Sequence, residues 1–387
     1  MPILVASVGS FQFSSGTSDL DVVAAGDWGC TGNSRKLVDI VKVTAPDLVL
    51  ALGDYSYANT ADCWLDLIKP IDSLTRINIG NHDDESKTLL RTYLQHFDLT
   101  QQYYGYDIKN IHVLTISTED LFKVGSEQYN FVLHDLQNAA YNPAIKWIIV
   151  NMHFPLYVSP NTCGDRACEG DGNVRDTYHP LFDKYGVDLV LQGHVHNYQR
   201  SYPLMFDSAS SSSPIITSCD KESYRDPEGQ IYIIVGTGGI NLHGLSGKSP
   251  FMANQQDSKF GILNIHSSSE LLNVKFIDGQ GKSFDQFNVT KEIKNNVADG
   301  SGEINATDTT KKNLHCDDLI LFKEKNQNKK DSEKDKVDKN KRDMTKPKQE
   351  SKKTAEKGDG KGNKGGGNSD GKGNKGGGKG HGKGNKG

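Results

Sequence analysis

The chain has 387 residues, of which 24% are charged and 35% are hydrophobic, and its formal net charge is -4. This length allows one or two domains, and no apolar run approaches the roughly 18 residues of a membrane-spanning helix, so no transmembrane segment is expected. Residues 323–387 hold 21 Lys and Arg against 10 Asp and Glu, a charge of +11, whereas residues 1–322 hold 24 against 39, a charge of -15. An acidic body argues against nucleic acid as a specific partner.

Composition divides the chain into three regions. Residues 1–18 are rich in Ser and Gly and read as a loose lead-in, and residues 19–322 are expected to form one folded domain with its core at about 20–290. Residues 323–387 consist largely of Lys, Gly, Asp and Glu, and such a low-complexity segment buries no core. We therefore predict a disordered basic tail, which either acts as a solvated arm or contacts an anionic surface.

The folded region opens with three units in which a strand, a loop and a helix follow one another. The expected strands are 21–26, 48–52 and 76–79, and the expected helices are 34–43, 62–68 and 87–96. Further expected elements are two strands within 103–118, a helix at 127–140, and strands at 146–150, 187–191, 231–235, 261–266 and 271–277. This order predicts an α/β fold of two packed sheets flanked by helices, with polar sites at the carboxyl ends of the strands.

Polar side chains follow five of these strands directly. They are Asp27, Asp54, Tyr57, Asn81, His153, His194 and His196. Each of them alone is most often a cap, a turn residue or an ordinary histidine. Together they offer more ligands than one ion with open positions needs, and they suit two metal ions that share a bridging carboxylate.

Tyr57 points to the identity of one ion. The phenol has an ordinary pKa near 10 and stays protonated at neutral pH unless a strongly Lewis-acidic cation displaces its proton. A tyrosine ligand therefore predicts a ferric ion.

The order of the motifs resembles that of a known family. The motifs are Asp27-Trp28-Gly29, Gly53-Asp54-Tyr55-Ser56-Tyr57, Gly80-Asn81-His82-Asp83, Val150-Asn151-Met152-His153 and Gly193-His194-Val195-His196. This set, continued by Asn197-Tyr198-Gln199-Arg200-Ser201-Tyr202, resembles the plant-type purple acid phosphatases within the calcineurin-like metallophosphoesterases, over about residues 20–280.

The resemblance implies a fold, a metal centre and an activity. The fold is the metallophosphoesterase four-layer α/β/β/α sandwich of two mixed sheets. Asp27, Tyr57 and His196 are implied to hold Fe(3+), Asn81, His153 and His194 a divalent ion (Fe, Zn or Mn), and Asp54 to bridge the two. The implied activity is that of an acid phosphatase, which hydrolyses phosphate monoesters by in-line attack of metal-bound hydroxide. The alternatives are a phosphodiesterase or nucleotide pyrophosphatase on the same scaffold, and a non-catalytic surface-binding protein with a vestigial site.

The catalytic acid and the substrate contacts are less defined. His82, beside Asn81, is the candidate general acid or phosphate contact. The plant-type members carry further histidines shortly after the Val-x-x-His motif, but residues 154–175 of this chain contain none and offer Cys163, Asp165, Arg166 and Cys168 instead. Arg166 is a candidate phosphate contact. His179 and His243 are expected to be structural. The oligomeric state is open, because we do not expect this sequence to contain the N-terminal β-sandwich domain of the plant-type members.

Six cysteines without a Cys-x-x-Cys pair permit disulfides, and Cys163 and Cys168 are placed to close a short loop. The sequons that begin at Asn288 and Asn305 favour an extracytoplasmic or secreted location. Residues 3–6 lack the basic flank and the length of a signal peptide, so the chain as written has no clear signal.

Overall fold

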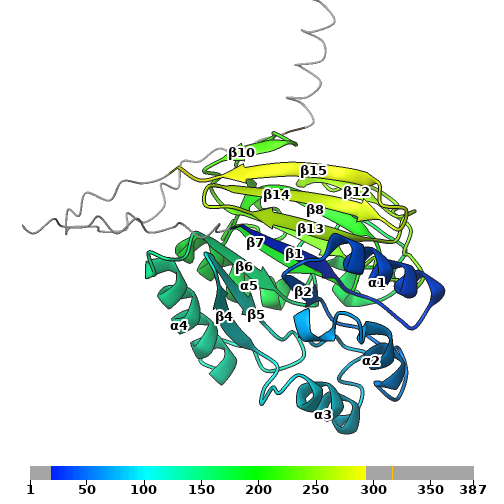
Figure 1. The fold of residues 1–387 in the computed structure, drawn as a ribbon. Coiled ribbons are helices and arrows are strands. Elements are labelled where there is room, and N and C mark those ends of the chain that lie inside the picture. The colour runs from blue at the N-terminus through cyan, green and yellow to red at the C-terminus, as the bar shows by residue number, and fades with distance from the viewer. Residues whose placement is uncertain (1–18, 293–315, 317–387) are drawn as a thin grey trace, which may run out of the picture. The chain divides into compact units, whose positions relative to one another are not determined.

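The computed structural model describes residues 19–292 and residue 316 (Figure 1). The expected lead-in of residues 1–18, the expected tail of residues 323–387 with its anionic partner, and the sequon at Asn305 lie outside the described residues. The boundary of the folded domain at residue 322 stays a prediction for the same reason.

The strands form two mixed sheets. In spatial order the first sheet consists of β10 (Ser223–Arg225), β15 (Ser283–Thr290), β14 (Leu271–Asp278), β13 (Gly261–Ser267), β1 (Leu20–Ala25), β2 (Leu48–Ala51) and β3 (Thr75–Ile77). The second consists of β12 (Met252–Gln256), β8 (Tyr198–Met205), β11 (Gln230–Val235), β7 (Leu189–Gln192), β6 (Trp147–Asn151), β5 (Ile111–Thr115) and β4 (Tyr104–Ile108), with β9 (Ile215–Ile216) beside β8.

Helices lie outside the two sheets (Figure 1). They are α1 (Gly32–Thr44), α2 (Asp62–Ile68), α3 (Lys87–His96), α4 (Glu127–Tyr141) and α5 (Gly172–Tyr185), with short 3₁₀ turns η1 (Asp72–Leu74) and η2 (Arg166–Glu169). The predicted four-layer α/β/β/α architecture is confirmed, and α2 and α3 have the predicted bounds. The helix α5, whose interior contains Pro180, was not predicted from the sequence. The strands β8, β12 and β15 were not predicted either.

Side chains that point alternately to the two faces of a strand explain the layers of the fold. On β6, Trp147 and Ile149 pack into the core between the sheets, whereas Ile148 and Val150 pack with residues of α4 and α5 on the outer face. Successive side chains of a strand point to opposite faces, so a strand buried on both faces reads as a continuous apolar run. This is the pattern that the sequence shows at residues 147–150.

A buried ion pair joins the two sheets. The guanidinium of Arg200 on β8 contacts the carboxylate of Asp285 on β15, with Nε at 2.6 Å from Oδ2 and an Nη at 3.0 Å from Oδ1. Arg200 also donates to the hydroxyl of Tyr224 at 2.9 Å and lies over the ring of Phe287 at 4.4 Å. Arg200 is 1% exposed, so this pair is a structural link.

The parallel strands bring the predicted polar loops to one edge. Strands β1, β2 and β3 are parallel neighbours, with Ala25, Ala51 and Ile77 in register. Strands β5, β6, β7 and β11 are parallel in the other sheet. The carboxyl ends of β1, β2, β3, β6 and β7 therefore deliver their loops where open α/β sheets place their sites.

One histidine outside that edge makes stability depend on pH. His112 on β5 is 5% exposed, and its two ring nitrogens lie 2.7 Å from the carboxylates of Asp107 on β4 and Asp135 on α4. Burial by itself lowers the pKa of His112, but the two carboxylates outweigh it, and the pKa is raised above 6.5. The histidine therefore stabilises the fold fully below pH 6.5, and that contribution is lost as pH rises through the higher folded pKa.

We expect the free energy of unfolding in urea to fall between pH 6 and pH 8, and we expect His112→Gln to remove part of this fall. His134→Gln, which changes an exposed histidine of α4, is the matched control and should leave the fall unchanged. A His112→Gln protein with the whole wild-type pH dependence would contradict the assignment.

Candidate metal centre

Backbone hydrogen bonds join the loop after β1 to the loop after β2. The backbone N–H of Asp27 donates to the carbonyl of Gly53 at 3.0 Å, and that of Trp28 donates to the carbonyl of Asp54 at 2.9 Å. A disulfide between Cys30 and Cys63 links the segments that follow these loops. The two loops therefore hold their side chains in a fixed relation.

Backbone strain occurs at predicted ligands in the loops after β1, β2 and β7. Eight non-glycine residues in the described part of the chain have positive φ, and four of them are predicted ligands. The four are Asp27 (φ 60°), Asp54 (56°), Tyr57 (50°) and His194 (67°). The left-handed region costs a non-glycine residue of order 1–3 kcal/mol, and such residues cluster at functional sites. The strain marks the edge predicted from sequence as the site.

Two motif glycines make room for the ligand side chains. A Cβ atom on Gly53, whose φ is +88°, would lie 2.5 Å from Nδ1 of His153. A Cβ on Gly80 would clash with a carboxylate oxygen of Asp54 and would lie 2.6 Å from the Asp54 nitrogen. The loops approach one another too closely for any larger residue at either position.

Three of the predicted ligands form one cluster. The hydroxyl of Tyr57 lies 3.2 Å from Oδ1 of Asp27 and 2.9 Å from Nε2 of His196, and that Nε2 lies 3.4 Å from Oδ1 of Asp27. Nδ1 of His196 is 2.8 Å from the carbonyl of Asn241, so Nδ1 carries the proton and Nε2 offers its lone pair to the cluster.

A second cluster lies beside the first. Ligand atoms of Asp54, His153 and His194 lie within 4.8 Å of one another. His153 is fully buried, and its Nδ1 donates to the carbonyl of Leu52 at 2.8 Å, which leaves Nε2 facing the cluster. Oδ1 of Asn81 is buried in the adjoining loop and has no hydrogen-bond partner in the described part of the chain.

Asp54 belongs to both clusters. Its Oδ2 lies 3.3 Å from the hydroxyl of Tyr57 and 3.3 Å from Nε2 of His153. Its Oδ1 accepts the backbone N–H of His82 at 2.9 Å. The carboxylate is 1% exposed and lies between the two sets of side chains.

The buried charges shift one another's pKa values. Burial raises the pKa of Asp54, but the neighbouring His153 outweighs burial and lowers it to about 2. Burial lowers the pKa of His153, but Asp54 raises it to about 10. Burial, and then Asp27 and Asp54, raise the pKa of Tyr57 far above 10, so the phenol ionises here only beside a strong cation.

The donor set fits metal ions. Nε2 of His153 and Oδ1 of Asn81 are buried without a hydrogen-bond partner among the described residues, and a ring nitrogen of His194 lies within 4.8 Å of ligand atoms of Asp54 and His153. Buried polar atoms are almost always satisfied, so the unpartnered Nε2 of His153, which lies 3.3 Å from Oδ2 of Asp54, and the unpartnered amide oxygen of Asn81 indicate a cation site. Two adjoining clusters with one shared carboxylate match the donors of two ions.

Of the two predicted substrate contacts, His82 lies against the first cluster, whereas no contact joins Arg166 to either cluster within the described residues. The ring centroid of His82 lies 4.6 Å from that of Tyr57, and the His82 side chain is 39% exposed. Its Nδ1 is 2.6 Å from a carboxylate oxygen of Glu85, so Nε2 is the nitrogen left for a substrate. Arg166 is exposed at the start of η2, and within residues 19–292 no hydrogen bond or ion pair fixes its guanidinium.

No role was predicted for Asp83 from the sequence, but in the structure it contacts the backbone of two loops of the site. Its carboxylate accepts the backbone N–H groups of Asp54 at 2.7 Å, Tyr55 at 2.9 Å and Gly80 at 2.9 Å. It therefore fixes the loops after β2 and β3. Its position in the Gly-Asn-His-Asp motif was the available signal.

His243 was expected to be structural, and it supports a predicted ligand. Its ring stacks on that of His196 with centroids 3.9 Å apart, and its Nδ1 accepts the backbone N–H of His196 at 3.1 Å. The backbone N–H of His243 donates to the carbonyl of His196 at 2.8 Å. Nothing in the local sequence distinguishes this histidine, because the contact joins two distant loops.

Comparison with known families identifies the class of this fold and site. Residues 20–198 match the model of the calcineurin-like phosphoesterases. Over these residues the chain has the pattern of a calcineurin-like phosphoesterase domain.

Its relatives narrow the class further and confirm the resemblance to the purple acid phosphatases. The chain is 28% identical to purple acid phosphatase 22 of Arabidopsis thaliana over 61% of this chain and 54% of that protein. It is 29% identical to acid phosphatase type 7 of mouse over 50% of this chain and 48% of that protein. A probable inactive purple acid phosphatase 1 of Arabidopsis thaliana is 26% identical over 68% of this chain and 46% of that protein. The chain thus spans about half the length of these relatives.

Solved structures share the fold. A purple acid phosphatase from yellow lupin seeds superposes with a TM-score of 0.62 and 22% identity, over 73% of this chain and 55% of that one. GAP50, described as the anchor in the inner membrane complex of Plasmodium, superposes with a TM-score of 0.54 and 14% identity, over 72% and 90% of the two chains.

Proposed function

We propose that this protein is a binuclear-metal acid phosphatase that hydrolyses phosphate monoesters. The observation that carries the proposal is the pair of adjoining side-chain clusters that share the buried carboxylate of Asp54. The match to the phosphoesterase family model supports hydrolysis of phosphate esters, and the acid phosphatases among its relatives support the monoester class.

The ligands divide by their chemistry. We assign Asp27, Tyr57 and His196 to Fe(3+), because a carboxylate and a phenolate are hard anionic donors that suit a trivalent ion. We assign Asn81, His153 and His194 to a divalent ion (Fe, Zn or Mn), because an amide oxygen and two imidazoles suit a borderline cation. Asp54 bridges the two positions.

The protein's own residues then bind and orient the substrate. Such a pair of cations, when bound, neutralises phosphoryl oxygens and acidifies water. The partly exposed His82 lies beside Tyr57, and its Nε2 donates the proton that the leaving oxygen requires, while Glu85 holds Nδ1. Asp83 keeps the backbone of the Asp54 and Gly80 loops in place during the reaction. We propose Arg166, on the loop before α5, as a further contact for the phosphate ester.

Three disulfides accompany this site, and they are Cys30–Cys63, Cys163–Cys168 and Cys219–Cys316. The last one brings Cys316 onto the outer core of the second sheet. Disulfides persist mainly in oxidising compartments. We therefore propose an extracytoplasmic or secreted location. Within the described residues, none of the helices has the length and apolar character needed to span a bilayer.

The reaction class is tested by comparing p-nitrophenyl phosphate with bis(p-nitrophenyl) phosphate at acid pH, using protein whose metal content is known. We expect faster turnover of the monoester. Faster turnover of the diester would replace the proposal with a phosphodiesterase. A protein with two bound ions and no turnover of either ester would favour the non-catalytic alternative.

Tyr57→Phe tests the ferric position. Since phenolate-to-iron charge transfer requires the phenol oxygen, we expect the visible absorption band of the iron-loaded protein to vanish while the far-ultraviolet circular dichroism stays unchanged. Tyr55→Phe is the matched control, because Tyr55 is buried and hydrogen-bonds to the carbonyl groups of Ala51 and Asn78 away from the ligand atoms. A visible band that survives in Tyr57→Phe would refute the iron-tyrosinate assignment.

A further inference from the structure

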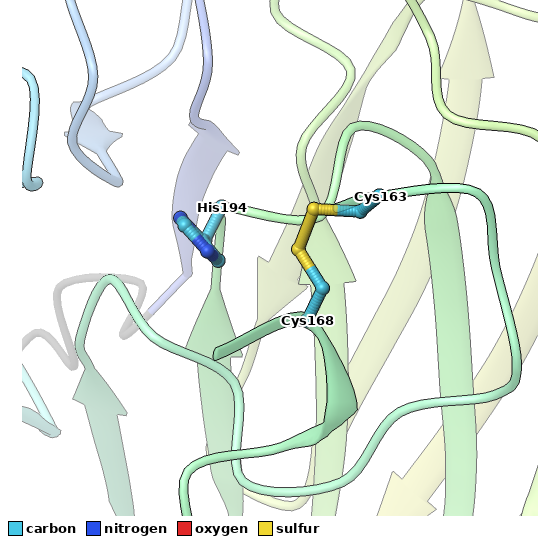
Figure 2. Close-up of side chains that lie close together, drawn as sticks. All are labelled: Cys163, Cys168 and His194. Carbon is cyan, nitrogen blue, oxygen red and sulfur yellow. A yellow bond between two sulfur atoms is a disulfide. The ribbon is translucent and has the colours of Figure 1, made fainter. Parts of the chain in front are cut away.

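The loop between β6 and α5 contains a feature that the proposed chemistry does not use. Cys163 and Cys168 form a disulfide with Cα atoms 6.0 Å apart. Both Sγ atoms and a ring nitrogen of His194 lie within 4.8 Å of one another. Figure 2 shows the imidazole of His194 beside this disulfide. The closed loop therefore lies against a proposed ligand of the divalent ion.

Asp165 lies inside this disulfide loop, and its two carboxylate oxygens face different groups. Oδ1 accepts the backbone N–H of Ala167 at 2.9 Å and so caps η2. Oδ2 lies 3.8 Å from Nε2 of His194. That nitrogen is buried and has no hydrogen-bond partner among the residues that the structure describes. Asp165 is thus the charged acceptor beside an unsatisfied imidazole nitrogen.

His194 differs from the other two histidines of the site in the hydrogen bonding of its ring nitrogens. Nδ1 of His153 lies 2.8 Å from the carbonyl of Leu52, and Nδ1 of His196 lies 2.8 Å from the carbonyl of Asn241. A histidine that binds a metal usually donates its other N–H to such an acceptor, which fixes the tautomer and the ring orientation. His194 needs an acceptor of the same kind.

The disulfide loop is anchored on both sides. The side chain of Asn161 accepts the backbone N–H of Cys163 at 2.8 Å and donates to the carbonyl of Cys168 at 3.0 Å. The backbone N–H of Thr162 donates to the carbonyl of Gly244 at 2.8 Å, and the N–H of Gly244 donates to the hydroxyl of Thr162 at 2.9 Å. The loop can therefore hold Asp165 near His194 although the Asp165 side chain is 51% exposed.

We propose that Asp165, held by the Cys163–Cys168 disulfide loop, is a positioning residue for His194. Its carboxylate accepts the Nε2–H of the imidazole, which leaves Nδ1 as the nitrogen that faces the divalent ion. Closing the gap of 3.8 Å to hydrogen-bond length takes a shift of about 1 Å. The inference rests on the proposed function, because it takes His194 as a ligand of the divalent ion.

The disulfide has a physical role in this arrangement. A short cross-link removes conformations from a loop, so less entropy is lost when Asp165 is ordered against His194. The loop occupies the segment of residues 154–175 that contains no histidine. The carboxylate acts there through His194, without touching the substrate.

Asp165→Asn separates the charge from the loop structure. Asparagine keeps an oxygen for the N–H of Ala167, so η2 stays capped, but it presents an amide N–H to Nε2 of His194 in place of a carboxylate. We expect affinity for the divalent ion, measured with Zn²⁺ by competition against a chelator, to fall about 10–100-fold. The visible band of the ferric position should stay unchanged.

Glu169→Gln is the matched control, since it removes one negative charge from the same exposed loop away from His194. It should leave Zn²⁺ affinity at the wild-type value. An equal loss in both variants would show a general effect of charge and would overturn the inference, as would unchanged affinity in Asp165→Asn. A wild-type protein that binds fewer than two ions would overturn the proposed function as well.

The role of the disulfide has its own test. We expect the Cys163→Ser/Cys168→Ser protein to bind Zn²⁺ more weakly than the wild type. Adding Asp165→Asn to that protein should cost less affinity than it costs in the wild type, because residues that act as a unit are not additive. A fully additive triple variant would show that the disulfide does not act through Asp165.

Discussion

Replacing Asp54 with asparagine is expected to remove ions from both metal positions and to lower kcat/KM for a phosphate monoester by on the order of 10³-fold or more. Metal ions supply several kcal/mol of charge stabilisation to such reactions, and about 1.4 kcal/mol corresponds to a factor of 10. The effect reaches both positions because Oδ2 of Asp54 lies 3.3 Å from Tyr57 and 3.3 Å from His153. Metal content per chain and steady-state kinetics measure the two losses.

His153→Ala is the contrasting variant for this prediction. His153 belongs to the second cluster alone, so its loss should empty the divalent position and leave the ferric band. Equal loss of both ions from His153→Ala would undo the assignment of sides. Retention of both ions in Asp54→Asn would show that Asp54 does not bridge them.

Asp285→Ala is expected to reduce the free energy of unfolding by about 3–5 kcal/mol, because it leaves the guanidinium of Arg200 buried without its partner. Burial raises the pKa of Asp285, but Arg200 outweighs burial and the pKa is lowered. The pair therefore stabilises the fold above the unfolded pKa near 3.9, and this contribution is lost as pH falls through the lower folded pKa. Urea unfolding at pH 7 measures the first effect, and a series of urea unfolding curves from about pH 4 down to about pH 2 measures the second.

Arg225→Ala provides the control for an exposed pair. Arg225 and Glu292 lie 3.8 Å apart with side chains 79% and 70% exposed, and such pairs contribute about 0–1 kcal/mol. The double variant Arg200→Met/Asp285→Leu should regain part of the stability lost in Asp285→Ala, since it removes the uncompensated charge. A double variant as unstable as the single one would contradict the explanation.

Most of the fold and the positions of the candidate site could be predicted from the sequence, because both follow from local patterns. The apolar runs ended at Gly26, Leu52 and Val150, and polar residues followed each run within a few positions. Parallel pairing then brings the carboxyl ends of those strands together, so six of the predicted ligands meet in two adjoining clusters, and Asn81 lies in the neighbouring loop. The helix α3 has the bounds that its helical pattern predicted, and in the structure the side chain of Ser86 caps its first turn.

Features that depend on distant contacts were not visible in the sequence. Arg200 stood in a recognisable motif, but its partner Asp285 lies on a strand that was not predicted. The support of His196 by His243, and of His194 by Asp165, also joins loops that are far apart in sequence. The helix α5 was missed because Pro180 in its interior reads as a helix breaker.

The central claim is that the two clusters hold two ions that act together on phosphate esters. The most direct measurement is to remove all metal from the purified protein, add iron and a divalent ion in steps, and follow bound ions and p-nitrophenyl phosphate turnover in the same samples. We predict that turnover appears only as the second ion per chain binds and reaches its maximum at two. Full turnover with one bound ion, or no turnover with two, would contradict the account.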